Sequence, residues 1–164
     1  MISQKNEKDC LQTTLANLLS IPYEVVPTFY QSYEKRGESD FFIELDDWLN
    51  SIGRYRILFD AGFREDGKIS IPFYCGVEKF RCIGILEKEG RKFSHAVLLE
   101  FERKKDGSFN IEMYDPKPNS EYDLFDLVQI EIIAKREESP SVAKSAPKET
   151  EEAQKHLTTG QVSQ

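Results

Sequence analysis

The first third of the chain repeats its hydrophobic residues with the period of an α-helix. Residues 10–19 place four leucines on one helical face: Leu11, Leu15, Leu18 and Leu19. Asp9 stands at the N-cap position of a helix that begins at Cys10. Residues 23–35 are compatible with a second, short helix. A third helical pattern follows, which Ser39 or Asp40 can cap and Gly53 ends.

From residue 55 onward the hydrophobic pattern is that of β-strands. We expect strands over six segments: 55–60, 68–78, 81–87, 94–102, 108–115 and 127–135. The segments 94–102 and 108–115 are predicted to form an antiparallel pair that turns at the intervening Lys-Lys-Asp-Gly. Helices that precede strands in this way predict an α+β fold.

The composition indicates one globular domain followed by a polar tail. The chain has 164 residues, of which 39% are hydrophobic, and residues 1–136 carry the patterned segments. Residues 137–164 contain no aromatic residue and are rich in Ser, Thr, Glu, Lys and Gln. Such a segment buries too little apolar surface to offset its ordering entropy, so we expect it to be disordered.

Charge and hydropathy exclude several classes of function. The formal net charge of −7 argues against a nucleic-acid-binding surface, which normally carries a basic patch. No apolar run approaches the roughly 20 residues that span a bilayer. The opening segment lacks the apolar centre of a secretion signal. We therefore expect a cytoplasmic protein that binds neither nucleic acid nor a membrane.

The cysteines predict reduced thiols. Cys10, Cys75 and Cys82 are three in number and cannot all pair with one another. No Cys-x-x-Cys motif or histidine cluster has the spacing of a zinc site, so we expect no metal and no other cofactor. Cys75 and Cys82 lie in strand-like segments and are predicted to be buried.

Cys10 is placed differently from the other two cysteines. It lies about 100° from the centre of the leucine face, at the start of its helix. Unpaired backbone N–H groups and the helix dipole favour a thiolate at this position, and the thiolate is the reactive form. A nucleophile needs a base, and the sequence has only two histidines. His156 lies in the predicted tail, which leaves His95 at the head of a strand.

Asp115 is the candidate to orient the imidazole of His95, because Pro116 favours an extended backbone at the end of its strand. A three-residue loop at 104–106 would set Asp115 opposite His95. A tight turn at 106–107 would set it opposite Leu98, at the same end of the hairpin.

Gln4 supplies a fourth role. A tetrahedral intermediate on the Cys10 sulfur carries an oxyanion, to which the Cys10 N–H and the Gln4 amide can donate hydrogen bonds. Such a donor contributes roughly 3 kcal/mol of barrier lowering.

The set of Gln4, Cys10, His95 and Asp115 resembles the catalytic residues of papain-like cysteine peptidases. The segment QKNEKDC reproduces the family's spacing from oxyanion glutamine to nucleophilic cysteine. The stretches SHAVLLE and YDP are most similar to the bacteriocin-processing peptidases, which cut after double-glycine leaders, and to small proteins of bacteriophages and bacteria. The resemblance implies helices packed on a mainly antiparallel sheet. It also implies Cys10 as nucleophile, His95 as base and acid, and Asp115 as its orienting group.

Two hypotheses from different classes follow. The first is a hydrolase that cleaves a peptide or amide bond of a peptide or protein substrate through an acyl-enzyme, with a transferase or deamidase as variants of the same chemistry. The second is a catalytically silent papain-like module that binds or inhibits a partner, such as a phage protein acting on a host factor. A thiol redox protein is disfavoured because no resolving cysteine lies near Cys10 in the sequence.

Overall fold

The computed structural model describes most of the first 136 residues: 1–6, 8–63, 69–70 and 77–136. The predicted tail at 137–164, most of the predicted strand at 68–78 and Cys75 lie outside the described residues. The helical elements are α1 (Cys10–Leu19), η1 (Tyr23–Val25), α2 (Tyr30–Arg36), α3 (Glu38–Ser51) and η2 (Leu124–Asp126). The strands are β1 (Arg54–Asp60), β2 (Gly62–Phe63), β3 (Ile69–Ser70), β4 (Lys79–Leu86), β5 (His95–Arg103), β6 (Phe109–Tyr114) and β7 (Leu127–Lys135).

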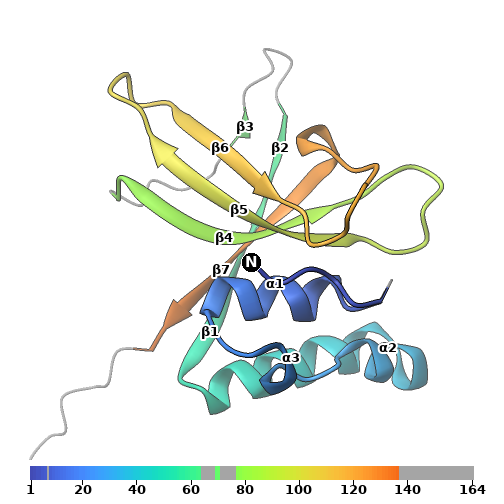
Figure 1. Cartoon of the computed structure of the whole chain (residues 1–164). Coiled ribbons are helices and arrows are strands. Elements are labelled where there is room, and N and C mark those ends of the chain that lie inside the picture. The colour runs from blue at the N-terminus through green and yellow to red at the C-terminus, as the bar shows by residue number, and fades with distance from the viewer. Residues whose placement is uncertain (7, 64–68, 71–76, 137–164) are drawn as a thin grey trace, which may run out of the picture.

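Five of the strands form one sheet in the order β1-β7-β4-β5-β6, and each neighbouring pair is antiparallel. The three α-helices lie together on one face of this sheet (Figure 1). Strands β2 and β3 form a separate two-stranded ribbon. The predicted α+β organisation is confirmed. Within the described residues, no helix combines the length and the apolar character needed to cross a bilayer.

The helix starts agree with the sequence pattern to different degrees. Helix α1 begins at Cys10 as predicted, but the Asp9 side chain makes no capping hydrogen bond to it. Helix α3 begins at Glu38, ahead of both predicted caps, because Gly37 adopts a φ of 95° that lets the chain turn directly from α2 into α3. Gly53, with a φ of 70°, follows the end of α3 and permits the turn into β1.

The register of the β5–β6 hairpin differs from both predicted alternatives. Leu98 lies opposite Tyr114, so the next position along places Asp115 opposite Val97. The loop has three residues, 105–107, because the Lys104 N–H donates to the Ser108 carbonyl at 2.7 Å. Gly107 supplies the left-handed conformation that closes the loop, with a φ of 85°. Since alternate residues of a strand share a face, Asp115 lies diagonally across from His95.

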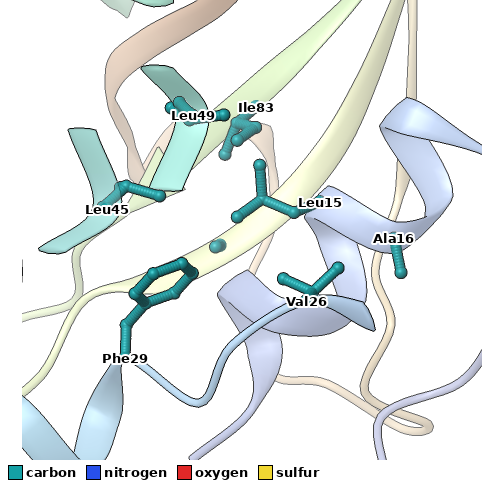
Figure 2. Close-up of a cluster of buried hydrophobic side chains, with 8 residues drawn as sticks. Leu15, Ala16, Val26, Phe29, Leu45, Leu49 and Ile83 are labelled. Carbon is teal, nitrogen blue, oxygen red and sulfur yellow. The ribbon is translucent and has the colours of Figure 1, made fainter. Parts of the chain in front are cut away.

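The core fills the space between the helices and the sheet (Figure 2). Its fully or almost fully buried residues are Leu15, Ala16, Val26, Phe29, Leu45, Leu49, Ile83 and Ala96. A second cluster packs on the opposite face of the sheet, and it includes Leu86, Val97, Leu99, Phe101 and Ile130. The Thr14 hydroxyl donates to the Ala96 carbonyl at 3.1 Å. This bond attaches α1 to β5 one residue from His95.

We expect the Leu15→Ala variant to lose about 2–5 kcal/mol of unfolding free energy, because the truncation leaves a cavity at a fully buried position. Urea denaturation followed by circular dichroism measures the loss. Ile43→Ala on α3 is the matched control, since Ile43 is exposed and its truncation should change stability by no more than about 0.5 kcal/mol. Equal losses in the two variants would contradict this assignment of the core.

Candidate active site

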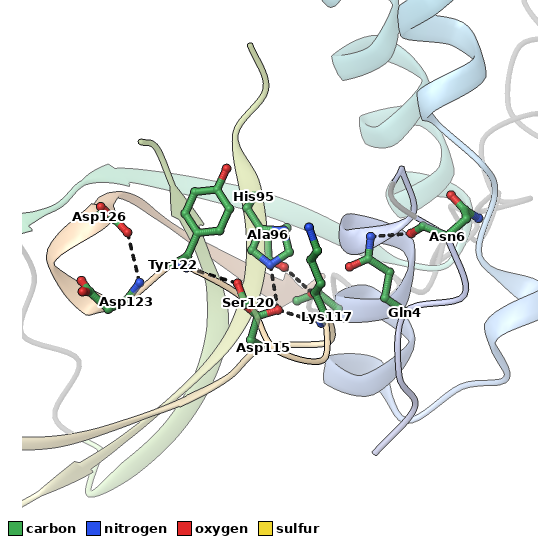
Figure 3. Close-up of polar contacts among 11 residues, drawn as sticks. Gln4, Asn6, His95, Ala96, Asp115, Lys117, Ser120, Tyr122, Asp123 and Asp126 are labelled. Atoms are coloured by element: carbon green, nitrogen blue, oxygen red, sulfur yellow. Dashed lines mark hydrogen bonds and ion pairs between the residues drawn. The ribbon is translucent and has the colours of Figure 1, made fainter. Parts of the chain in front are cut away.

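His95 and Asp115 form a hydrogen-bonded pair at the rim of the sheet (Figure 3). His95 is the first residue of β5, and Asp115 follows the last residue of β6. The His95 Nε2 lies 2.7 Å from the Asp115 Oδ1, which also accepts the Lys117 N–H at 2.7 Å. His95 is 6% exposed. The carboxylate therefore fixes the position of a ring that is largely removed from water.

Cys10 lies close to the same imidazole. The two side chains line one cleft, and hydrogen bonding and charge at Cys10 both raise the pKa of the ring. Because Nε2 is bonded to Asp115, Nδ1 is the ring nitrogen that remains for the sulfur. The helix start, the head of one strand and the end of the next thus bring together the three residues Cys10, His95 and Asp115. Cys10 is half-buried and remains within reach of solvent.

The electrostatics of the pair favour a protonated imidazole. Burial alone would lower the pKa of His95, but its hydrogen bonds with Asp115 and Cys10 and the charges of both groups outweigh burial and raise the pKa to about 9. Burial alone would raise the pKa of Asp115, but hydrogen bonds from His95, Ser120 and the Lys117 backbone hold it below its ordinary value. Below about pH 9, His95 is an imidazolium that faces a carboxylate and a sulfur.

Tyr122 is a site residue that the sequence analysis missed. Its ring stacks on the imidazole of His95, with the ring centroids 4.9 Å apart and the planes 20° from parallel. The Tyr122 N–H donates to the Ser120 Oγ at 3.3 Å, within the irregular segment that follows Asp115. Burial raises the pKa of Tyr122 above its ordinary value. No periodic pattern marks this segment, so only the fold places Tyr122 against His95.

Gln4 lies beside the pair, in the loop that precedes α1. Its backbone N–H donates to the Pro116 carbonyl at 2.8 Å, which ties the loop to the residue next to Asp115. Its side-chain Nε2 donates to the Asn6 carbonyl within the same loop. An amide nitrogen has two hydrogens, so this bond leaves one for a ligand. The fold thus brings the Gln4 backbone to the site, while its amide bonds within its own loop.

Asp9 holds this loop in place instead of capping α1. It is 2% exposed, and its carboxylate accepts the N–H groups of Lys5 at 3.1 Å and of Asn6 at 3.3 Å. The Tyr23 hydroxyl donates to the same carboxylate at 2.6 Å. Burial together with this bond raises the pKa of Tyr23 to about 12. Asp9 occupies the predicted N-cap position, but its side chain makes no capping bond because the carboxylate turns back toward the loop that carries Gln4.

A cleft of about 480 Å³ opens beside Cys10 and His95. Its walls include six aromatic side chains: Phe29, Tyr30, Tyr33, Phe41, Phe42 and Phe93. Phe41 packs against the core, and both Phe41 and Phe42 line the cleft. The thiol and the imidazole therefore border a space that suits an apolar or aromatic ligand group.

Cys82 is not among the residues that line this cleft. Cys82 is fully buried in the cluster on the far face of the sheet, as predicted. Within the described parts of the chain, no three His, Cys, Asp or Glu side chains are grouped in a way that could hold a metal ion.

We expect the imidazole of His95 to titrate near pH 9, well above its ordinary value of 6.5. NMR titration of the ring protons measures this pKa. In Asp115→Asn and in Cys10→Ser the pKa should fall toward 6.5, because each change removes a group that favours the imidazolium. Asp123→Asn is the control, since Asp123 caps η2 and makes no bond to His95. A pKa near 6.5 in the wild type would contradict the geometry.

We expect Asp9→Ala to release the loop that carries Gln4. The amide protons of Lys5 and Asn6 lose their charged acceptor, so their exchange with deuterium should accelerate by roughly tenfold or more. NMR-detected hydrogen exchange provides the measurement. Tyr23→Phe is the matched control, because it removes one partner of Asp9 and keeps the carboxylate. Equal acceleration in both variants would mean that the hydroxyl, and not the carboxylate, anchors the loop.

Comparisons of the chain with protein-family models, with curated proteins and with solved structures found no match. The proposed function therefore rests on the arrangement of the side chains.

Proposed function

We propose that the protein is a cysteine-dependent hydrolase that cleaves a peptide or amide bond through an acyl-enzyme. One observation carries the proposal: His95, whose Nε2 lies 2.7 Å from the Asp115 Oδ1, lines the same cleft as Cys10, a thiol at a helix start that lies close enough to raise the pKa of the imidazole. A nucleophile, a proton carrier and an orienting group stand in order beside a cleft.

The acylation step uses each of these groups. The Cys10 thiolate attacks the carbonyl carbon of the substrate, and a carbon–sulfur bond forms while the carbonyl oxygen takes the negative charge. The backbone N–H of Cys10, at the start of α1, and the free hydrogen of the Gln4 amide are the donors proposed to stabilise this oxyanion. The Nδ1 proton of His95 then passes to the leaving nitrogen as the carbon–nitrogen bond breaks.

Deacylation reverses the roles. The imidazole of His95, now neutral, takes a proton from water, and the resulting hydroxide attacks the thioester and releases the carboxylic acid with the thiolate. The imidazolium that forms is stabilised by the Asp115 carboxylate. An amine in place of water would make the same site a transferase, and a side-chain amide as substrate would make it a deamidase.

The arrangement supports a papain-like reading of the fold. Helix α1 carries Cys10 at its first residue, the antiparallel strand β5 carries His95 at its first residue, and Asp115 follows the neighbouring strand. This order and placement agree with the resemblance stated from the sequence, and the peptide or protein substrate is proposed on that basis.

The hydrogen bond between the Gln4 amide and the Asn6 carbonyl favours a second candidate, a silent module that binds or inhibits a partner. In such a module the amide would serve the loop, and the thiol and imidazole would be retained without turnover. The two candidates differ in one measurable property, which is whether Cys10 can be acylated and then released.

We expect p-nitrophenyl acetate to acylate Cys10. One equivalent of p-nitrophenolate should appear in a burst, followed by slower steady release, because the thioester forms faster than water removes it. Stopped-flow absorbance follows the burst, and mass spectrometry locates the acetyl group on Cys10. His95→Ala should slow the burst by roughly a hundredfold or more, since it removes the proton carrier.

His156→Ala, which changes the other histidine of the chain, is the matched control and should leave the burst unchanged. Acetylation at the rate of a free cysteine, equal in the wild type and His95→Ala, would rule out the hydrolase in favour of the binding module.

A further inference from the structure

The lining of the cleft includes a buried carboxylate that the proposed reaction does not use. Glu131 lies on β7, between Leu58 of β1 and Ile83 of β4, in the middle of the sheet. It lines the same cleft as Cys10 and His95. At 3% exposed, it is among the most deeply buried charged residues that the structure describes.

Glu131 is only partly neutralised by its neighbours. Its Oε1 lies 3.4 Å from the Nη1 of Arg56. Its Oε2 is buried and has no hydrogen-bond partner among the described residues. A buried carboxylate oxygen without a donor is costly, and native proteins rarely leave one unless a ligand or water satisfies it.

Arg56 binds Asp46 more closely than it binds Glu131. Its guanidinium makes two shorter contacts with Asp46, at 2.7 and 3.1 Å, and it lies over the ring of Phe42 at 4.9 Å. One cation therefore faces two carboxylates, and the group of Arg56, Asp46 and Glu131 has a formal net charge of −1 when both carboxylates are ionised. Burial raises the pKa of Glu131, and the Asp46 charge adds to this effect. A second cation beside Glu131 would balance the charge of the two carboxylates.

The walls of the cleft suit the stem of a long side chain. Phe41, Phe42, Leu45 and Ile85 line the same space and offer apolar and aromatic surface. Methylene groups pack against such surface, and a cation gains further from the faces of aromatic rings.

We infer that Glu131 is the acceptor for the cationic head of a lysine or arginine side chain of the substrate. This inference rests on the proposed function in one respect. The ligand is called a substrate because the cleft that Glu131 lines is also lined by Cys10. The stem of the side chain lies along the aromatic walls, and the head donates to the free oxygen of Glu131. The protein is thereby assigned to peptides with a basic residue near the bond that is cut.

The test uses three ligands of equal length: n-hexylammonium, 1-hexanol and hexanoate. Titration of the full chain by calorimetry or NMR should show hexylammonium binding at least about tenfold more tightly than hexanol, with hexanoate weakest, because a charged hydrogen bond to a buried carboxylate is gained only by the cation. Binding of hexanol or hexanoate as tightly as hexylammonium overturns the inference, and this comparison needs no variant.

Glu131→Gln identifies the acceptor, because it removes the charge and keeps the size of the side chain. The preference for hexylammonium over hexanol should then fall to about twofold or less. Glu87→Gln is the matched control: Glu87 lines the same cleft but is exposed, so the preference should persist. Loss of the preference in Glu87→Gln and its retention in Glu131→Gln would place the cation at the mouth and overturn the inference.

The cation site and the hydrolase can be tested separately, because binding requires no reaction. Cys10→Ala should therefore keep the preference for hexylammonium. If the wild type prefers hexylammonium but shows no ester burst, the hydrolase is overturned and the cation site is supported. A burst without any preference for hexylammonium would support the hydrolase and overturn the cation site.

Discussion

The attachment of helix α1 to strand β5 is the contact on which the site depends. Leu15 and Ala16 pack beneath the sheet, and the Thr14 hydroxyl donates to the Ala96 carbonyl. This contact sets the first turn of the helix beside the first residue of the strand. Because Cys10 and His95 are the residues at those two ends, the packing of an ordinary amphipathic helix carries a thiol to an imidazole.

The site is then fixed by polar contacts that converge from three directions. Asp115 holds one nitrogen of His95, Tyr122 covers one face of its ring, and Cys10 lies close enough to raise the pKa of the ring. The loop that carries Gln4 is tied to the Asp115 end through Pro116 and to the helix start through Asp9. Each contact limits the motion of a side chain at the site, so the imidazole and the carboxylate are held in fixed positions beside Cys10.

The cleft beside this site combines apolar walls with an incompletely neutralised charge. An apolar cleft alone would accept many ligands with little discrimination. A buried carboxylate in its lining makes the binding energy depend on what the ligand donates, because an unmatched ligand leaves the Glu131 Oε2 without a partner. The proposed reaction thus rests on Cys10 and His95, and the inferred selection of ligands rests on Glu131, which lines the same cleft.

Periodicity alone determined the helix at 10–19, the α3 segment and five strands of the main sheet, because those patterns record which face each element buries. The residue types, their order and their spacing, and not periodicity, singled out Cys10, His95, Asp115 and Gln4. Only the tertiary structure decided the hairpin register and the turn of the Asp9 side chain toward the loop. The same holds for the stacking of Tyr122 on His95 and for the Glu131 Oε2, which has no hydrogen-bond partner among the described residues. These depend on contacts between residues far apart in the chain, or on a single glycine's φ at 107, and neither leaves a periodic trace in the sequence.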